Sequence, residues 1–172
     1  MSPSMITIEQ LNAMMERDFI ATLERIFEHS PWVPARSAAA RPFASRSQLL
    51  EAMRATVDAA TTEEQLALIR AHPRLGSRGP GGEALTEASA GEQNRAGLQA
   101  AGVEDLSRLE QLNNLYQEKF GFPFVLAVRG HTPSSIIARC ESRLRNDAQL
   151  EQRLALREIG LIAQFRLAEV IA

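Results

Sequence analysis

One stretch of this sequence limits the possible folds more than any other. Phe124–Val128 is the one run with the composition of a β-strand. A strand needs a neighbour to pair its backbone N–H and C=O groups, and the rest of the sequence offers none. We therefore predict an extended segment that is buried against helices. Its main-chain groups would need other partners, and a bound polar ligand could supply them.

Elsewhere the apolar residues recur at spacings of three and four, which is typical of amphipathic helices. Capping signals precede several of these patterns, at Thr7–Gln10, Thr62–Gln65, Thr86 and Thr132–Pro133. We predict about eight helices with short connections, and hence an all-α multi-helix bundle. No repeat or composition shift marks a boundary, so we expect a single domain over residues 1–172.

The sequence also predicts where particular helices end. The pattern through Phe19 and Phe27 should stop at Ser30–Pro34, where two prolines oppose its continuation. We expect Arg36–Ala44 to be a loop, and we expect the helix that begins after Thr86 to run on to Gly102.

The composition excludes several classes of protein. The formal net charge is −2 and the basic residues are scattered, so the electrostatic pattern of a nucleic-acid binder is missing. No apolar run approaches the length of a membrane span, and the first residues do not resemble a signal peptide. The single cysteine, Cys140, fits a reducing compartment, so we expect a cytoplasmic protein.

The sequence gives little support for a metal site or a phosphate site. His29, His72 and His131 lack the spacing of a zinc site, and Cys140 stands alone, so we predict no bound metal. The glycine-rich stretch Gly76–Gly82 is not followed by Lys-Ser or Lys-Thr, which argues against a P-loop. A mobile loop beside a site is the expectation, with a plain surface connection as the alternative.

An acid–base site is indicated at His72–Pro73. A proline disfavours the helical conformation of the residue before it, so a helix should end near His72. Ser89, Glu92 and Gln93 then fall on one face of the next predicted helix. A histidine, a carboxylate and two neutral hydrogen-bonding groups could form such a site. Taken singly, each is also compatible with an ordinary helix end or a solvated helix surface.

Two more side chains have an ambiguous position. Arg166 lies among apolar residues of the last predicted helix, where an arginine either reaches solvent or pairs with a buried group or a ligand oxygen. Cys140 lies on an apolar stripe, where a buried and unreactive thiol is favoured over a nucleophile.

Further stretches are informative in combination: Glu28–Trp32, Arg41–Phe43, Ala71–Gly76, Ser89–Gln93, Ala96–Leu98, Asn113–Tyr116, Lys119–Phe124 and Ile162–Leu167. Together these stretches resemble the family of 2-oxo-4-hydroxy-4-carboxy-5-ureidoimidazoline (OHCU) decarboxylases. They occur in the family's order and span nearly the whole chain, and the combination is highly specific. One departure is Arg74, where many members carry an acidic residue, and this could change the charge at the mouth of the pocket.

The resemblance implies an all-α enzyme, usually a homodimer, that acts on a small ureidoimidazoline substrate without a cofactor. It matches His72 to the family's catalytic histidine and Glu92 to its partner carboxylate. The positions that it matches to substrate contacts are Pro73, Ser89, Gln93, Arg166 and the backbone of Phe124, Val125, Leu126, Ala127 and Val128.

We therefore predict a carboxy-lyase, a carbon–carbon lyase of urate degradation that converts OHCU to (S)-allantoin and CO2. It should not bind nucleic acid or membranes. The residues alone leave two alternatives open. One is another acid–base lyase or hydrolase of ureido compounds, and the other is a non-catalytic helical module that grips a protein partner.

Overall fold

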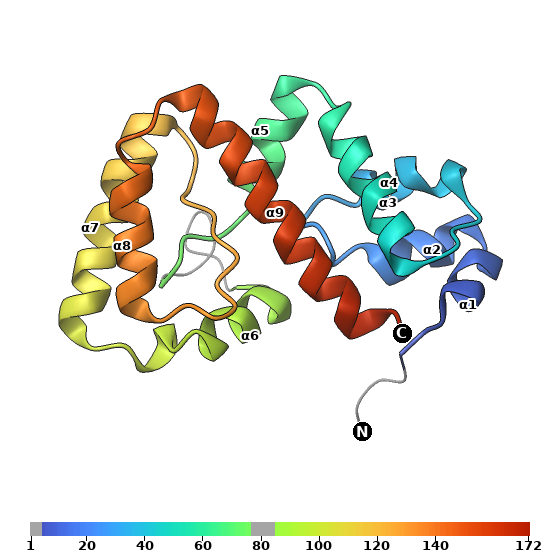
Figure 1. The fold of residues 1–172 in the computed structure, drawn as a ribbon, viewed down its shortest axis with the longest axis horizontal. Helices are drawn as coiled ribbons and strands as arrows, with labels where there is room; N and C mark the ends of the chain where they lie inside the picture. Colours follow the sequence, from blue (N-terminus) through green and yellow to red (C-terminus); the bar gives the residue numbers. More distant parts are fainter. Residues whose placement is uncertain (1–4, 77–84) are drawn as a thin grey trace. The chain divides into compact units, whose positions relative to one another are not determined.

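The computed structural model describes residues 5–76 and 85–172, and within these ranges the chain forms nine α-helices (Figure 1). The prediction of an all-α fold is confirmed. The helices are α1 (Ile8–Ala13), α2 (Glu16–Leu23), α3 (Trp32–Ser37), α4 (Arg46–Asp58), α5 (Thr62–Arg70), α6 (Glu87–Arg95), α7 (Val103–Phe120), α8 (Pro133–Arg143) and α9 (Ala148–Val170), with short 3-10 turns η1 (Ala38–Ala40) and η3 (Leu98–Ala100).

The chain divides into two compact units. The first comprises Met1–Leu68 with Gly160–Ala172, and the second comprises Ile69–Ile159. Helices α5 and α9 each contribute residues to both units. The expectation of one domain over the whole chain stays a prediction. Among the described residues, no helix is both long enough and apolar enough to cross a membrane.

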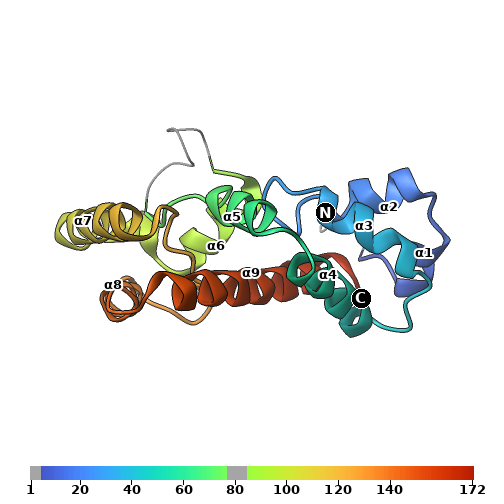
Figure 2. The ribbon, with the colours of Figure 1, turned by 90° about the horizontal axis from the view of Figure 1, so that it is seen from above.

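The first unit has a core built by its short N-terminal helices. Leu11, Phe19, Leu23, Leu49 and Met53 have no exposed surface. Helix α3 packs against α2 and α4, as can be followed in Figure 2. The two ends of the described chain are joined, because the N–H of Ile6 donates to the C=O of Val170, and that of Ala172 to the C=O of Ile6.

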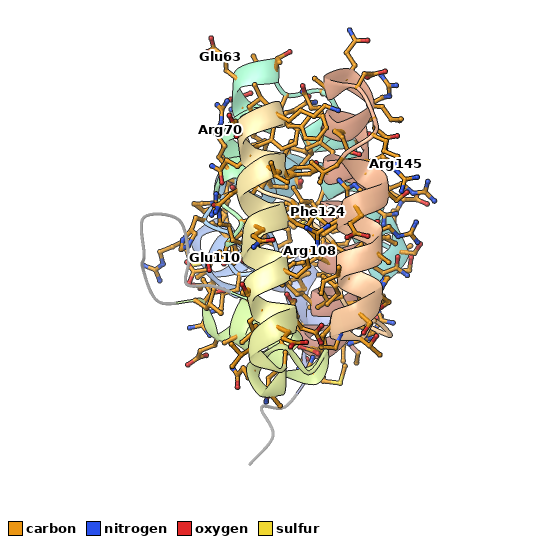
Figure 3. All side chains as sticks on the ribbon, turned by 90° about the vertical axis from the view of Figure 1, so that its left-hand side faces the viewer. Glu63, Arg70, Arg108, Glu110, Phe124 and Arg145 are labelled. Carbon is orange, nitrogen blue, oxygen red and sulfur yellow. The ribbon has the colours of Figure 1, made fainter. Side chains whose placement is uncertain are left out.

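The second unit surrounds the predicted extended segment. Helices α7 and α8 lie side by side (Figure 3), and Phe124–Val128 connects them outside any helix. The ring of Tyr116 on α7 has no exposed surface and lies 5.4 Å from the ring of Phe124, edge to face. Such pairs add about 0.5–1.5 kcal/mol to the burial of the rings, so the aromatic cluster anchors the segment at its start.

Several helix boundaries differ from those predicted. Trp32–Ser37 is helical, although we expected Arg36–Ala44 to be a loop, because Pro31 and Pro34 lie at the start of the helix, where backbone N–H groups lack intrahelical acceptors. Helix α6 ends at Arg95 instead of Gly102, since Gly97 adopts a left-handed conformation with φ 78°.

Other capping predictions hold with small shifts. Thr7 and Gln10 form the expected capping box. The box of α5 lies one residue earlier than predicted, because the N–H of Thr61 donates to the Glu64 carboxylate and the N–H of Glu64 donates to the Thr61 hydroxyl. Most of the predicted loop Gly76–Gly82 falls outside the described residues.

Gly76 turns the chain after α5. Its φ of 78° lies in the left-handed region, which other residues rarely adopt. A Cβ atom at this position would also come within 2.9 Å of Leu109 Cδ2 on α7. Both the conformation and the close packing therefore require glycine.

Replacing Gly76 with alanine should lower the free energy of unfolding by about 1–3 kcal/mol, because alanine is strained at this φ and meets Leu109. Urea denaturation followed by circular dichroism would measure the change. Gly91→Ala is a suitable control, since Gly91 lies inside α6 and its added Cβ would meet only Arg95, at 4.0 Å. That variant should be more stable by about 0.5–1 kcal/mol. If Gly76→Ala were as stable as the wild type, glycine would not be required at this position.

Candidate active site

The loop that carries His72 follows α5 directly. The helix ends at Arg70, and the N–H of His72 closes a last turn on the C=O of Ile69 at 3.2 Å. This confirms the prediction that the helix stops near His72–Pro73. The histidine is only 4% exposed. Its imidazole is therefore held in the interior of the second unit.

Helix α6 presents the predicted polar face. The hydroxyl of Thr86 accepts a hydrogen bond from the N–H of Ser89 and so starts the helix as expected. Ser89 and Gln93 are each 4% exposed, and Glu92 is half-buried. Buried polar side chains need partners, so this face of α6 is not the solvated surface that was the alternative.

One hydrogen bond joins the α6 face to the histidine loop. The N–H of Gly76, four residues after His72, donates to Oε1 of Gln93 at 3.0 Å. From the other side, Nδ2 of Asn113 on α7 donates to the C=O of Leu75 at 3.0 Å. The loop that follows His72 is thus pinned by buried amides from two helices. Two stretches that periodicity alone left unconnected meet here.

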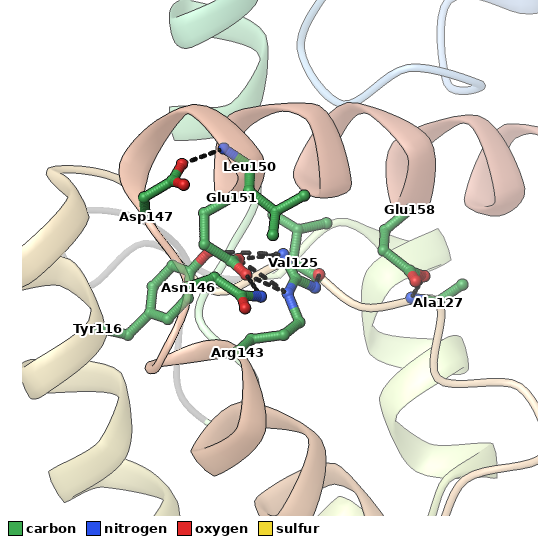
Figure 4. Close-up of polar contacts among 9 residues, drawn as sticks. All are labelled: Tyr116, Val125, Ala127, Arg143, Asn146, Asp147, Leu150, Glu151 and Glu158. Atoms are coloured by element: carbon green, nitrogen blue, oxygen red, sulfur yellow. Dashed lines mark hydrogen bonds and ion pairs between the residues drawn. The ribbon is translucent and has the colours of Figure 1, made fainter.

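The segment Phe124–Val128 is buried along its whole length, with every residue 8% exposed or less. Some of its backbone groups have protein partners (Figure 4): the C=O of Val125 accepts from Arg143 at 2.6 Å, and the N–H of Ala127 donates to Glu158 at 2.9 Å. The C=O of Val128 accepts from the N–H of His131. The backbone of Leu126, in contrast, makes no hydrogen bond within residues 5–76 and 85–172.

A buried ion pair lies behind this segment. The NH2 group of Arg143 on α8 lies 2.8 Å from Oε2 of Glu151 on α9, and the two side chains are 6% and 0% exposed. The hydroxyl of Tyr116 donates to the same carboxylate. Burial and this hydrogen bond both raise the pKa of Tyr116, so its hydroxyl stays protonated as a donor. Because the charges are paired and hydrogen-bonded, the burial of both is tolerated.

Arg166 belongs to the first unit, in the part of α9 that starts at Gly160. It is 5% exposed, so it does not reach solvent. Its NH1 group lies 2.9 Å from the carboxylate of Glu28, which is 2% exposed, and donates to the C=O of Arg25. The arginine is thus a buried, paired cation, and its contact with a ligand stays a prediction.

A cavity of about 390 Å³ lies where the histidine loop meets α7, between Arg74–Gly76 and Val103–Asn113. Its lining includes none of the predicted catalytic residues, so we place the chemistry elsewhere. Arg74, whose role was open, is held against α7 by hydrogen bonds to Gln117 at 3.0 Å and to Asn114 at 2.7 Å.

Cys140 is the buried thiol that its apolar stripe favours. It has no exposed surface, and burial raises the pKa of its thiol to about 12. A thiolate, which is the reactive form, is therefore not available at neutral pH.

Sequence reasoning missed the charged residues that bond to one another or to the segment Phe124–Val128. Glu151, which is buried, and Glu158, which is half-buried, lie on a helix whose pattern is dominated by leucines and isoleucines. A signal was present for Arg143, which follows Ile136 and Cys140 at helical spacing on their apolar stripe. Glu28 lies within one of the family stretches, but nothing in the sequence linked it to Arg166.

The comparisons with known proteins agree with one another. A family model described as OHCU decarboxylase matches residues 12–168. The 2-oxo-4-hydroxy-4-carboxy-5-ureidoimidazoline decarboxylase of Haloferax volcanii is 41% identical over 164 residues, which cover 95% of each chain. The uric acid degradation bifunctional protein PucL of Bacillus subtilis is 42% identical over 167 residues, which cover 97% of this chain and 33% of that protein.

Two solved structures are similar to this one. A crystal structure of (S)-allantoin synthase superposes with a TM-score of 0.76 at 29% identity, covering 96% of this chain and 54% of that chain. A crystal structure of OHCU decarboxylase in the presence of (S)-allantoin gives a TM-score of 0.70 and covers 90% and 96% of the two chains. At 20% identity, this second likeness concerns the fold alone.

Replacing Glu28 with glutamine should destabilise the protein by about 3–5 kcal/mol, because the buried charge of Arg166 would lose its counter-charge. Urea denaturation would measure the loss. Glu141→Gln provides the matched control, since Glu141 pairs with Arg108 at 2.7 Å with both side chains 40% exposed or more. An exposed pair contributes about 0–1 kcal/mol. Equal effects of the two substitutions would show that the Glu28–Arg166 pair is not needed for stability.

Proposed function

The chain belongs to the OHCU decarboxylase family, and we propose that it converts OHCU to (S)-allantoin and CO2 with His72 and Glu92 as catalytic residues. The observation that carries this proposal is the hydrogen bond between Gly76 and Gln93, because it joins the histidine loop to the polar face of α6. The burial of His72, Ser89 and Gln93 supports it, since a buried polar cluster suits a small polar ligand.

The chemistry of the substrate explains why no cofactor is needed for this reaction. OHCU carries a hydroxyl and a carboxylate on one ring carbon, next to an imine carbon that bears the ureido group. When the bond to the carboxylate breaks, its electron pair forms a double bond between the two ring carbons, and the imine nitrogen takes up the displaced pair and a proton. The substrate thus serves as its own electron sink.

Two proton movements then complete the reaction. The hydroxyl loses its proton and becomes a carbonyl, while the neighbouring carbon gains a proton from one face, which sets the stereocentre of allantoin. In our proposal His72 interacts with the hydroxyl and helps to deliver the proton, because an imidazole can both accept and donate near neutral pH. Glu92 would orient His72 and contact the hydroxyl.

The substrate would be bound mainly by uncharged groups. With Oε1 of Gln93 bonded to Gly76, its amide would turn N–H groups toward an oxygen of the substrate. Ser89, Pro73 and the backbone of Phe124–Val128 would hold the ring and the ureido amides. The backbones of Phe124 and Leu126 suit this role best, because both are buried and make no hydrogen bond among the described residues.

Arg166 remains a proposed substrate-binding residue, through a carbonyl or carboxylate oxygen, and the matching stretch Ile162–Leu167 supports it. We also propose a homodimer, as the resemblance implies, and a cytoplasmic location, as the single cysteine suggests. Sedimentation equilibrium would test the dimer by giving a mass of twice 19.0 kDa.

The activity can be tested by generating OHCU in situ from urate with the two upstream enzymes and following allantoin by circular dichroism. We expect the protein to speed the appearance of one enantiomer above the spontaneous rate. His72→Ala and Glu92→Ala should each lower the rate by about 10²–10⁴, as loss of a general acid–base does, while both stay folded.

His131→Ala serves as the control, because the imidazole of His131 bonds to its neighbour Ser135 at the start of α8 and is no part of the proposed site, while the substitution keeps the backbone N–H that donates to Val128. It should keep near wild-type activity. A wild-type rate no faster than the spontaneous reaction would reject the proposed function. Full activity of the His72 or Glu92 variant would remove that residue from the mechanism.

A further inference from the structure

The segment Phe124–Val128 is held at alternate residues. Arg143 on α8 donates to the C=O of Val125, and Glu158 on α9 accepts from the N–H of Ala127 (Figure 4). In an extended backbone, the polar groups of successive residues face opposite sides. Bonds at residues 125 and 127, with none at Leu126 between them among the described residues, fit this alternation.

The two residues that bond to the segment, Arg143 and Glu158, differ in how firmly their own side chains are held. Arg143 is fixed by Glu151 and Tyr116, and all three are buried. Glu158 is only half-buried, and among the described residues its carboxylate bonds only to the N–H of Ala127. The carboxylate of Glu158 thus bonds α9 directly to the segment. Because the carboxylate is charged, this hydrogen bond is stronger than one between neutral groups.

We propose that Glu158 and Arg143 are positioning residues, which hold Val125 and Ala127 so that the backbone of Leu126 faces the substrate. The inference rests on the proposed function, in which that backbone binds the ring or ureido amides of OHCU. Neither residue touches the substrate. They act by holding the backbone of Phe124–Val128 in place. In a β-sheet, hydrogen bonds to a neighbouring strand would do this, but the segment has no such neighbour among the described residues.

Glu158 permits the sharper test, because removing Arg143 would leave the buried Glu151 without its counter-charge and unfold the protein. Three variants are compared with the wild type. Glu158→Ala removes the acceptor, Glu158→Gln keeps a neutral acceptor of the same reach, and Glu118→Ala removes an exposed carboxylate from α7 as the control.

Glu158→Ala should raise the KM for OHCU about tenfold with kcat changed by less than about twofold, because it loosens binding of substrate and transition state alike. Its affinity for allantoin, measured by calorimetry, should fall by a similar factor. Amide hydrogen exchange at residues 124–128 should be faster than in the wild type. Glu158→Gln should restore most of each property, and Glu118→Ala should change none.

Faster exchange in Glu158→Ala with unchanged KM and unchanged allantoin affinity would overturn the inference, since Glu158 would then be only structural. So would unchanged exchange. If the wild type itself fails to speed allantoin formation, the proposed function falls, and allantoin affinity together with exchange still decides whether Glu158 positions a binding edge. Failure of Glu158→Gln to restore KM would also contradict a role as hydrogen-bond acceptor.

Discussion

The arrangement of the second unit depends on one buried ion pair, between Arg143 and Glu151. Burying two charges is costly, and it is tolerated only when each is paired and hydrogen-bonded. Here the carboxylate also accepts from Tyr116, while the guanidinium also donates to the C=O of Val125. Without that last bond, a main-chain carbonyl would be buried without a partner. The pair therefore links three helices and makes a buried, non-helical segment possible in an all-α protein.

The same solution recurs at the histidine loop. Side-chain amides, instead of backbone ladders, satisfy the main chain: Gln93 accepts from Gly76, and Asn113 donates to the C=O of Leu75. The histidine loop and the segment Phe124–Val128 are thus both held by side chains from neighbouring helices. A polar ligand site needs such stretches, since a helix has already used its own backbone groups and offers only its ends and side chains.

Much of this could be predicted from the sequence, because the decisive signals were local. Periodicity and caps predicted the helices, and the lone β-like run predicted an extended segment. The errors also have local causes: Pro31 and Pro34 were taken as helix breakers although they lie where a helix begins, and Gly97 ended α6 before Gly102 did. The pairs Glu28–Arg166 and Arg143–Glu151 could not be predicted, since each joins residues from different parts of the fold and nothing in the sequence marks a charged residue as buried. The catalytic and binding roles came from the family resemblance, and they remain proposals.

The bond between Gln93 and Gly76 has a consequence for which amino acids position 93 can hold. Its oxygen accepts from the N–H of Gly76, and in the proposed function its nitrogen would donate to the ligand, so one side chain would be acceptor and donor at once. A glutamate would keep the loop but offer the ligand only a negative charge. A lysine would offer donors but release the loop. Of the two amide side chains, asparagine is one methylene shorter, so chain length as well as polarity restricts this position to glutamine.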